Sequence, residues 1–277
     1  MTARSSCGAL LKAYVVLVLL FLFAPLGASL VFSFNSDRFP TLPLGSFTLH
    51  WYEAVLADEL VRESLGHTAR VSVLSATLST LLGFAAAYTD YRHEFLGKRL
   101  YLALGLLPPT VPAIILGLAM LAYLSRLGLA GSWVAIVIAH TVICTPFAMA
   151  LVRLRLSQVD RSLEAAAWNL GATPWAALRH VILPFCAPTL LGAWLLTMAV
   201  SFDEFAIAWF VGGLHETLPV RVLGFLQGQV SPRINAIGTL VFAVSIALVA
   251  VAQLVLARRL SLRHPRTAAA LQPKTHP

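Results

Sequence analysis

The most informative segment of the chain is RLRLSQVDRSLEAAAWNLGATPWAALRHVILP, residues 153–184, which separates two long apolar runs. Its pattern predicts a short helix that Asp160 or Ser162 can cap. The apolar residues of this helix recur at the i, i+3, i+4, i+7 spacing of a single face, formed by Leu163, Ala166, Ala167 and Leu170. Gly171 is then expected to end the helix, because glycine enters the left-handed conformation without strain.

A second short helix is expected directly after this stop. Thr173 is placed to cap it, and Pro174 occupies its first position, where a backbone N–H is not needed. Its buried side would consist of Trp175, Leu178, Val181 and Ile182, and Pro184 would begin the next span. A pair of helices tied to two membrane spans has a shape that could receive a push from a separate protein. An ordinary surface hairpin is an equally open alternative.

Outside this segment the chain is dominated by apolar residues. They make up 58% of the 277 residues, against 12% charged residues and a mean hydropathy of +0.81. Runs long enough to cross about 30 Å of hydrocarbon occur at residues 13–34, 68–89, 102–124, 132–152, 184–211 and 236–257. We therefore expect an all-α integral membrane protein with about six transmembrane helices, in which residues 13–260 form one membrane domain.

Two of these runs have an unusual composition. Residues 68–89 are rich in serine and threonine, which indicates a helix that packs among other helices through small and hydroxyl side chains. Residues 102–124 contain Pro108, Pro109 and Pro112, so the first turns of that span must be kinked or broken.

The distribution of basic residues predicts the orientation. If residues 1–12 are cytoplasmic, fourteen of the 20 lysines and arginines fall on the inner side and six on the outer side. Both termini and the loop 153–183 are then cytoplasmic, and residues 35–67 are periplasmic. Residues 13–34 are longer than a signal-peptide core, so we expect a retained first helix.

Two further segments lie outside the spans. Within residues 35–67 the spacing of Trp51, Val55, Leu56 and Leu60 predicts a short helix at the outer surface. Residues 261–277 are polar and contain prolines, so a disordered cytoplasmic tail is expected there.

The sequence carries no signature of catalysis or of a metal site. Cys7, Cys144 and Cys186 are scattered, and no HExxH or GxSxG pattern occurs. Gly97 and Lys98 lack the other residues of a phosphate-binding loop, so ATP would have to be hydrolysed by another chain. The net charge of +8 is spread between apolar runs rather than gathered with aromatic residues, which argues against nucleic acid as a partner.

The fifth apolar run contains adjacent carboxylates in the sequence Ser201-Phe202-Asp203-Glu204. An ionised group at the bilayer centre costs roughly 2.5 to 3.5 kcal/mol on insertion scales, so it tends to face a water-filled cavity or a partner charge. We expect Asp203, and less directly Glu204, to face a path taken by a cationic substrate. Pairing of a carboxylate with Arg221 or with a partner subunit is the structural alternative.

Residues 164–184 also resemble a known family motif. The run contains Glu164, Ala165, Ala166, Leu170, Gly171, Ala172, Leu183 and Pro184. It is similar to the EAA loop of the permeases of binding-protein-dependent ABC importers, whose pattern is Glu-Ala-Ala, three residues, Gly, nine residues and Ile-x-Leu-Pro. Alignment on Gly171 and Pro184 puts the family's glutamate at Ala165, with Glu164 displaced by one residue.

The resemblance extends over residues 48–260. Segments such as Leu49-His50-Trp51-Tyr52, Pro112-Ala113-Ile114-Ile115 and Ser231-Pro232-Arg233-Ile234 are similar to the second permease of spermidine and putrescine importers. Ala113 and Arg233 stand where that branch often has acidic residues.

This resemblance implies the type I ABC importer (MetI-like) permease architecture in a bacterial inner membrane. It implies a cytoplasmic ATPase dimer that uses ATP and Mg²⁺, a second homologous permease, a periplasmic solute-binding protein and surrounding lipid. The chain itself would bind no cofactor and would form half of a translocation pathway, with a polyamine as the expected solute. An amino-acid-like solute, a phosphonate, a metal or an anion remains the alternative cargo, and a secondary transporter the rival class.

Overall fold

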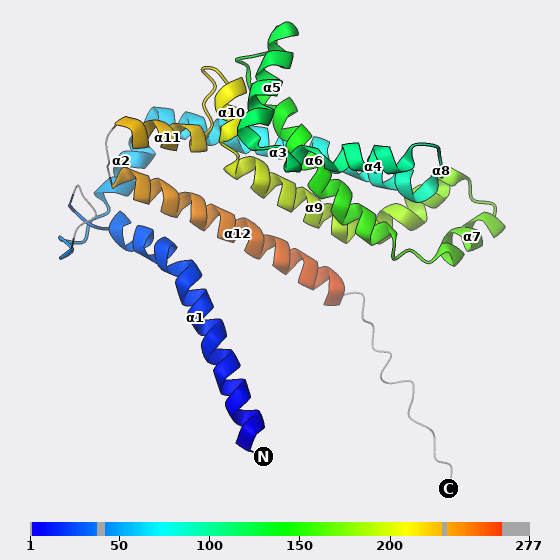
Figure 1. The fold of residues 1–277 in the computed structure, drawn as a ribbon, viewed down its shortest axis with the longest axis horizontal. Helices are drawn as coiled ribbons and strands as arrows, with labels where there is room; N and C mark the ends of the chain where they lie inside the picture. The colour runs from blue at the N-terminus through cyan, green and yellow to red at the C-terminus, as the bar shows by residue number, and fades with distance from the viewer. Residues whose placement is uncertain (1, 38–41, 229–231, 262–277) are drawn as a thin grey trace. The chain divides into compact units, whose positions relative to one another are not determined.

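The computed structural model describes residues 2–37, 42–228 and 232–261, and the regular elements in these ranges are all helical. In chain order they are α1 (Thr2–Ser33), α2 (His50–Ala57), α3 (Glu59–Arg92), α4 (Lys98–Leu106), η1 (Pro108–Thr110), α5 (Ala113–Arg126), α6 (Trp133–Leu156), α7 (Arg161–Asn169), α8 (Pro174–Ala177), η2 (Leu178–Ile182), α9 (Leu183–Asp203), α10 (Ala206–Val211), α11 (Leu218–Gly228) and α12 (Arg233–Ser261) (Figure 1). The expected all-α fold is therefore confirmed.

The described part of the chain divides into two compact units, one within residues 1–68 and 215–244 and the other within residues 69–214 and 245–277. Among the described residues, four helical stretches are long and apolar enough to cross a membrane. They are Leu10–Ser33, Glu59–Arg92, Trp133–Leu156 and Pro174–Asp203. Shorter apolar helices account for the other expected spans.

The first unit is organised around the short helix α2. Val55 and Val61 are buried with Leu218, Ala236 and Ile237, so α2 packs with the start of α3, with α11 and with the start of α12. The predicted short helix in residues 35–67 is present as α2, but Leu60 belongs to α3.

The second unit contains the close packing of α3 on α6. The hydroxyl groups of Ser75 and Ser79 donate to the backbone oxygens of Val137 and Thr141 at 3.2 and 3.3 Å. Elsewhere around α3 the exposed positions include four leucines: Leu74, Leu78, Leu81 and Leu82. The prediction that residues 68–89 pack through small and hydroxyl side chains is confirmed, since a small-residue stripe lets two backbones approach closely.

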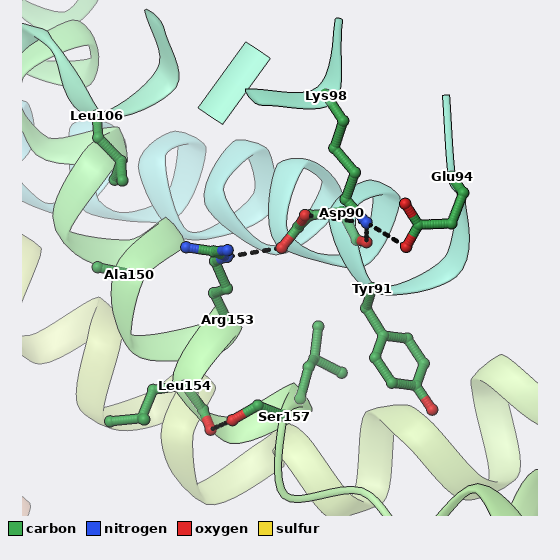
Figure 2. Close-up of a pocket in the computed structure, with 10 residues that line it drawn as sticks. Asp90, Tyr91, Glu94, Lys98, Leu106, Ala150, Arg153, Leu154 and Ser157 are labelled. Atoms are coloured by element: carbon green, nitrogen blue, oxygen red, sulfur yellow. Dashed lines mark hydrogen bonds and ion pairs between the residues drawn. The ribbon is translucent and has the colours of Figure 1, made fainter. Parts of the chain in front are cut away.

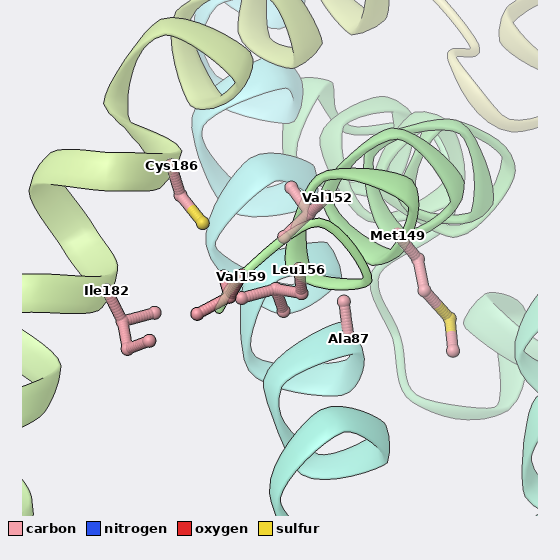
Figure 3. Packing of buried hydrophobic residues seen from close by; sticks show 7 residues of the cluster. All are labelled: Ala87, Met149, Val152, Leu156, Val159, Ile182 and Cys186. Atoms are coloured by element: carbon pink, nitrogen blue, oxygen red, sulfur yellow. The ribbon is translucent and has the colours of Figure 1, made fainter. Parts of the chain in front are cut away.

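A buried cluster joins α3, α6, the loop after α6, η2 and α9 (Figure 3). It consists of Ala87, Met149, Val152, Leu156, Val159, Ile182 and Cys186. This core lies where the chain leaves α6 and returns to α9, so it anchors both ends of the segment 153–183.

The third expected span is interrupted by its prolines. α4 ends at Leu106, η1 holds Pro108 and Pro109, and α5 begins only after Pro112. The break expected in the first turns of the span 102–124 is therefore confirmed: two helices and a 3₁₀ turn take the place of one helix, because each proline lacks the backbone donor that continues a helix.

The fifth expected span differs at both ends. α8, η2 and α9 form one helical stretch from Pro174 to Asp203, so Pro184 lies inside it rather than at its start. A π-helical turn at η2 carries the helix past that proline. At the other end Glu204 is extended, with φ −73° and ψ 114°, and the separate helix α10 follows, so no helix runs through residues 184–211.

The two terminal segments, residues 1–12 and 261–277, can be compared with their predicted structure only in part. α1 begins at Thr2, so the expected cytoplasmic segment 1–12 is helical and continuous with the first span from residue 2 onward. The expected disordered tail, 261–277, lies outside the described residues except for Ser261, the last residue of α12.

Candidate functional site: an exposed helical hairpin and a broken span

Residues 160–183 contain α7, α8 and η2, and we call this segment the hairpin. It begins with a capped helix, α7. The carboxylate of Asp160 accepts a hydrogen bond from the backbone N–H of Ser162 at 2.9 Å, so Asp160 is the cap and Ser162 is not. Donation by the backbone N–H and the hydroxyl of Ser162 lowers the pKa of Asp160 below its ordinary value. A carboxylate at this position also interacts favourably with the helix dipole.

The predicted stop and restart of the hairpin are confirmed. Gly171 has φ +82°, and its N–H donates to the backbone oxygen of Trp168 at 2.9 Å. Thr173 then accepts from the backbone N–H of Ala176 at 3.2 Å, with Pro174 in the first turn of α8. These are the local interactions that the residue types favour at a helix end and a helix start.

The apolar face of α7 is not covered by the described part of the chain. Leu163 is 47% exposed and Leu170 is 89% exposed, and Ala165 and Ala166 are exposed as well. Trp175 in α8 is 67% exposed, so its expected place on the buried side of that helix was wrong, whereas Ile182 is fully buried as expected. Leaving large apolar side chains in water is unfavourable, and such patches mark contact surfaces.

The other candidate hairpin residues differ in their exposure. Ala172 and Leu183 are half-buried, and Pro184 is exposed.

Glu164 is buried, unlike the residues of this exposed face. It is 5% exposed, and its carboxylate accepts from the Tyr91 hydroxyl at 3.3 Å and from Arg92 Nη1 at 3.5 Å. The Arg92 guanidinium in turn lies 4.7 Å from the centre of the Trp168 ring. Because one residue turns a helix by about 100°, the carboxylate at position 164 faces α3 while Ala165 stays outward.

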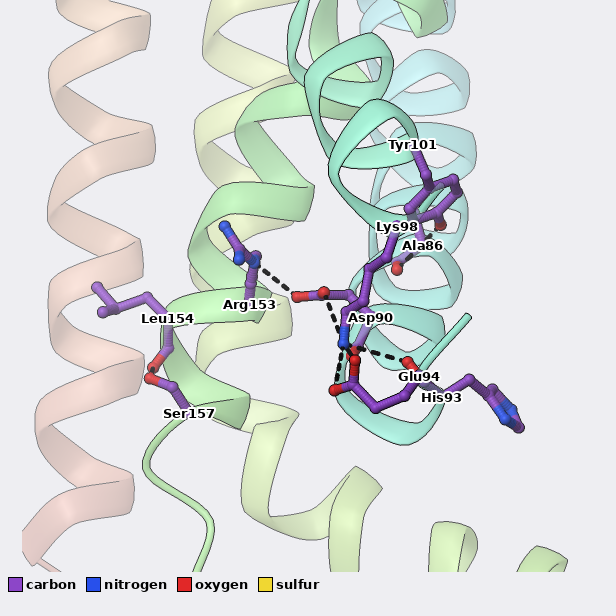
Figure 4. Close-up of polar contacts among 9 residues, drawn as sticks. All are labelled: Ala86, Asp90, His93, Glu94, Lys98, Tyr101, Arg153, Leu154 and Ser157. Carbon is purple, nitrogen blue, oxygen red and sulfur yellow. Dashed lines mark hydrogen bonds and ion pairs between the residues drawn. The ribbon is translucent and has the colours of Figure 1, made fainter. Parts of the chain in front are cut away.

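The end of α3 is joined to α4 and α6 by a group of charges that sequence reasoning missed (Figure 4). Arg153 Nε donates to Asp90 Oδ2 at 2.6 Å, and Lys98 Nζ lies 3.3 Å from Asp90 Oδ1. Lys98 also donates to the backbone oxygens of Asp90 and His93 and to the carboxylate of Glu94. The carboxylates of Glu94 and Asp90 raise the pKa of Lys98 above its ordinary value. The ammonium group thereby occupies carbonyls that α3 leaves unpaired at its C-terminus.

A cavity of about 440 Å³ borders this charge group (Figure 2). Its charged lining consists of Asp90, Glu94, Lys98 and Arg153, and the lining continues over Leu106, Ala150 and Leu154. The sequence did show one sign of this group, since Asp90 lies at the end of a hydroxyl-rich span. Its partner Arg153 is 63 residues away, so the pairing could not be read from the sequence.

The break between α9 and α10 holds the second set of candidate residues. Asp203 is exposed, whereas Glu204 is half-buried and accepts from the backbone N–H of Ile207 at 3.1 Å. Ser201 and Phe202 are buried, and Ser201 Oγ lies 2.9 Å from Nδ1 of the fully buried His140. Of the four candidates, Asp203 alone is exposed, and Glu204 accepts a hydrogen bond from the first turn of α10.

Arg221, the predicted alternative partner of Asp203, pairs with another carboxylate. Its guanidinium donates to Glu216 Oε2 at 2.8 Å. Pairing of Asp203 with Arg221 stays a prediction. A carboxylate in a break of a spanning helix is an arrangement that transport pathways use.

A helical membrane chain with a broken span and an exposed apolar hairpin has the features of a transporter's membrane subunit. A family model described as the binding-protein-dependent transport system inner membrane component matches residues 79–262, more than half of the chain. The chain belongs to this family, and it is a permease subunit of an ABC importer. The family is a transport component rather than an enzyme.

Known relatives agree with this membership. The chain is 30% identical to the spermidine/putrescine transport system permease protein PotC of Haemophilus influenzae, over 88% of this chain and 95% of the relative. It is 33% identical to the putrescine transport system permease protein PotI of Escherichia coli K12, over 82% and 84% of the two chains. A solved bacterial ABC transporter that imports the acidic polysaccharide alginate has a similar fold, with a TM-score of 0.72 at 14% identity over 92% of this chain and 96% of the other.

Proposed function

We propose that this chain forms half of the translocation pathway of an ATP-driven polyamine importer. It pairs with a second, homologous permease, docks an ATPase dimer on its cytoplasmic side and receives solute from a periplasmic binding protein. The relatives named for spermidine and putrescine support the solute class, because each match covers more than four fifths of this chain. An amino-acid-like solute, a phosphonate, a metal or an anion is the alternative cargo.

The exposed face of the hairpin is the observation that carries the docking proposal. Leu163 and Leu170 lie on one side of α7, and no described residue covers them. The partner ATPase binds this face and uses ATP and Mg²⁺, while the permease chain binds neither. The excess of basic residues in the segments 1–12 and 153–183 supports the same orientation, with the hairpin and both termini in the cytoplasm of a bacterial inner membrane.

A charge on the docking face tests this proposal. We expect Leu170→Asp to weaken binding of the ATPase at least tenfold, about 1.4 kcal/mol, because a carboxylate would be buried without a partner. The measurement is the amount of ATPase that copurifies with the permease in detergent. Leu96→Asp is the matched control, since Leu96 is fully exposed in the loop between α3 and α4 and lies outside the hairpin. Equal copurification in both variants would contradict the docking role.

The exposed carboxylate of Asp203 is the proposed contact for a cationic solute. We expect Asp203→Asn to reduce polyamine uptake about tenfold without loss of folded protein, because the side chain makes no described contact that holds the helices together. Glu204→Gln is the comparison, since the Glu204 carboxylate accepts from the backbone N–H of Ile207 in α10; we expect it to reduce thermal stability more than uptake. Undiminished uptake by folded Asp203→Asn would remove Asp203 from the pathway.

A further inference from the structure

Three consecutive residues at the end of α3 contact three other helices. Asp90 pairs with Arg153 of α6 and with Lys98 of α4, while Tyr91 and Arg92 bind Glu164 of α7. The hairpin is therefore fastened to α3, as well as to α6 and α9, the helices that flank it in the sequence. Figure 4 shows the Asp90 part of this arrangement, with Arg153 on one side and Lys98 on the other.

The attachment of α7 to α3 depends on few side chains. Among the described side chains of α7, Glu164 is the one that hydrogen-bonds to another helix, and Trp168 adds its contact with the Arg92 guanidinium. The Glu164 side chain is 7% exposed and that of Arg92 is 28% exposed. A carboxylate this deeply buried is strongly disfavoured once its cation is removed. Separation of α7 from the end of α3 would break both hydrogen bonds to Glu164 and the contact between Arg92 and Trp168.

The contacts of Asp90 extend this connection into the membrane helices. The 2.6 Å bond between Arg153 and Asp90 holds the end of α3 against α6, one of the helices that could span the membrane. α3 is itself a single helix of 34 residues, Glu59–Arg92. A displacement of α7 must thus move the end of a spanning helix or break the contacts of Glu164 with Tyr91 and Arg92.

We propose that the last turn of α3 is the transmission element of this permease, and that Glu164 and Arg92 are positioning residues that couple motion of the hairpin to the spanning helices. This inference rests on the proposed function, in which an ATPase docks on the hairpin. It assigns the two sides of α7 different tasks. The outer side holds the ATPase, and Glu164 on the inner side passes the motion to α3.

Exchange of the two charges tests the inference in the whole complex. The variants are Glu164→Gln, Arg92→Glu, and the double exchange Glu164→Arg with Arg92→Glu. For each we would measure ATPase copurification, ATP hydrolysis with and without the loaded binding protein, and the number of ATP molecules hydrolysed per solute imported. Glu164→Gln keeps the shape of the side chain and an acceptor for Tyr91, so we expect this variant to fold.

We expect both single variants to retain the ATPase and to lose at least tenfold in hydrolysis stimulated by the loaded binding protein, with more ATP consumed per solute. The double exchange restores the stimulation at least partly. Glu94→Gln is the control, because Glu94 is 89% exposed and pairs with Lys98 rather than with α7. It should behave like the wild type.

The outcomes separate this inference from the proposed function. Wild-type stimulation in Glu164→Gln, or single variants that lose the ATPase itself, would overturn the transmission role, since the pair would then be dispensable or would serve docking alone. The transmission role would also be contradicted if the single variants lost stimulated hydrolysis and the double exchange did not restore it. Failure of the wild-type chain to bind any ATPase would instead refute the proposed function.

Discussion

Replacement of Gly171 by proline is expected to abolish solute-dependent ATP hydrolysis by the assembled transporter. Gly171 has φ +82°, whereas proline is fixed near −65°. Proline would also remove the N–H that donates to the backbone oxygen of Trp168 at 2.9 Å. The end of α7 and the start of α8 would then be redirected, so the exposed faces of the two helices would no longer form one surface. The measurement is ATP hydrolysis by the purified complex with the loaded binding protein.

Gly171→Ala is the matched control for this prediction. A Cβ at position 171 meets no atom within 4 Å, so alanine adds only the penalty of the left-handed conformation, about 1 to 2 kcal/mol. We expect a folded permease with reduced but measurable stimulation. Full activity of the proline variant would show that the geometry of the hairpin turn is not needed for coupling.

Replacement of Gly83 by alanine is expected to cause the largest loss of stability among conservative substitutions in α3. A Cβ at this position would lie 2.7 Å from both the Ala148 Cβ and the backbone nitrogen of Met149. Since backbone atoms cannot rotate away, α3 and α6 would have to separate. Overpacking of this kind costs typically about 1 to 3 kcal/mol. The expected result is a lower unfolding temperature and a lower yield of monodisperse protein in detergent.

Gly192→Ala in α9 is the control, because a Cβ there meets nothing within 4 Å. It also replaces a helical glycine by the residue with the highest helix propensity, so its unfolding temperature should equal or exceed that of the wild type. If both alanine variants unfolded at the wild-type temperature, the close approach of α3 and α6 would be refuted.

The sequence was most informative where local chemistry decides the structure. The hairpin was predicted from its caps and its glycine, and Thr173, Pro174 and Gly171 occupy the expected positions. The hydroxyl-rich face of α3 was predicted from composition, and Ser75 and Ser79 bond to α6 as that composition suggests.

The features that were not predicted depend on neighbours far away in the sequence. Trp175 follows the spacing of a buried face, yet it is exposed because no described element covers that side of α8. The break after Asp203 lies within an apolar run, and hydropathy alone does not report that the backbone is extended at Glu204 and that a new helix follows. The pairing of Glu164 with Arg92 joins residues 72 positions apart, so no periodicity could reveal it.

The most direct test of the central claim is ATP hydrolysis by the reconstituted complex of this chain, its partner permease, the ATPase and the binding protein. Putrescine and spermidine would be compared with unrelated solutes at equal occupancy of the binding protein. The account predicts that ATPase copurifies with the permease and that a polyamine stimulates hydrolysis, with the stimulation lost in Gly171→Pro. Stimulation by another solute alone would contradict the polyamine assignment, and the absence of any bound ATPase would contradict the proposal that the exposed hairpin is the ATPase docking site.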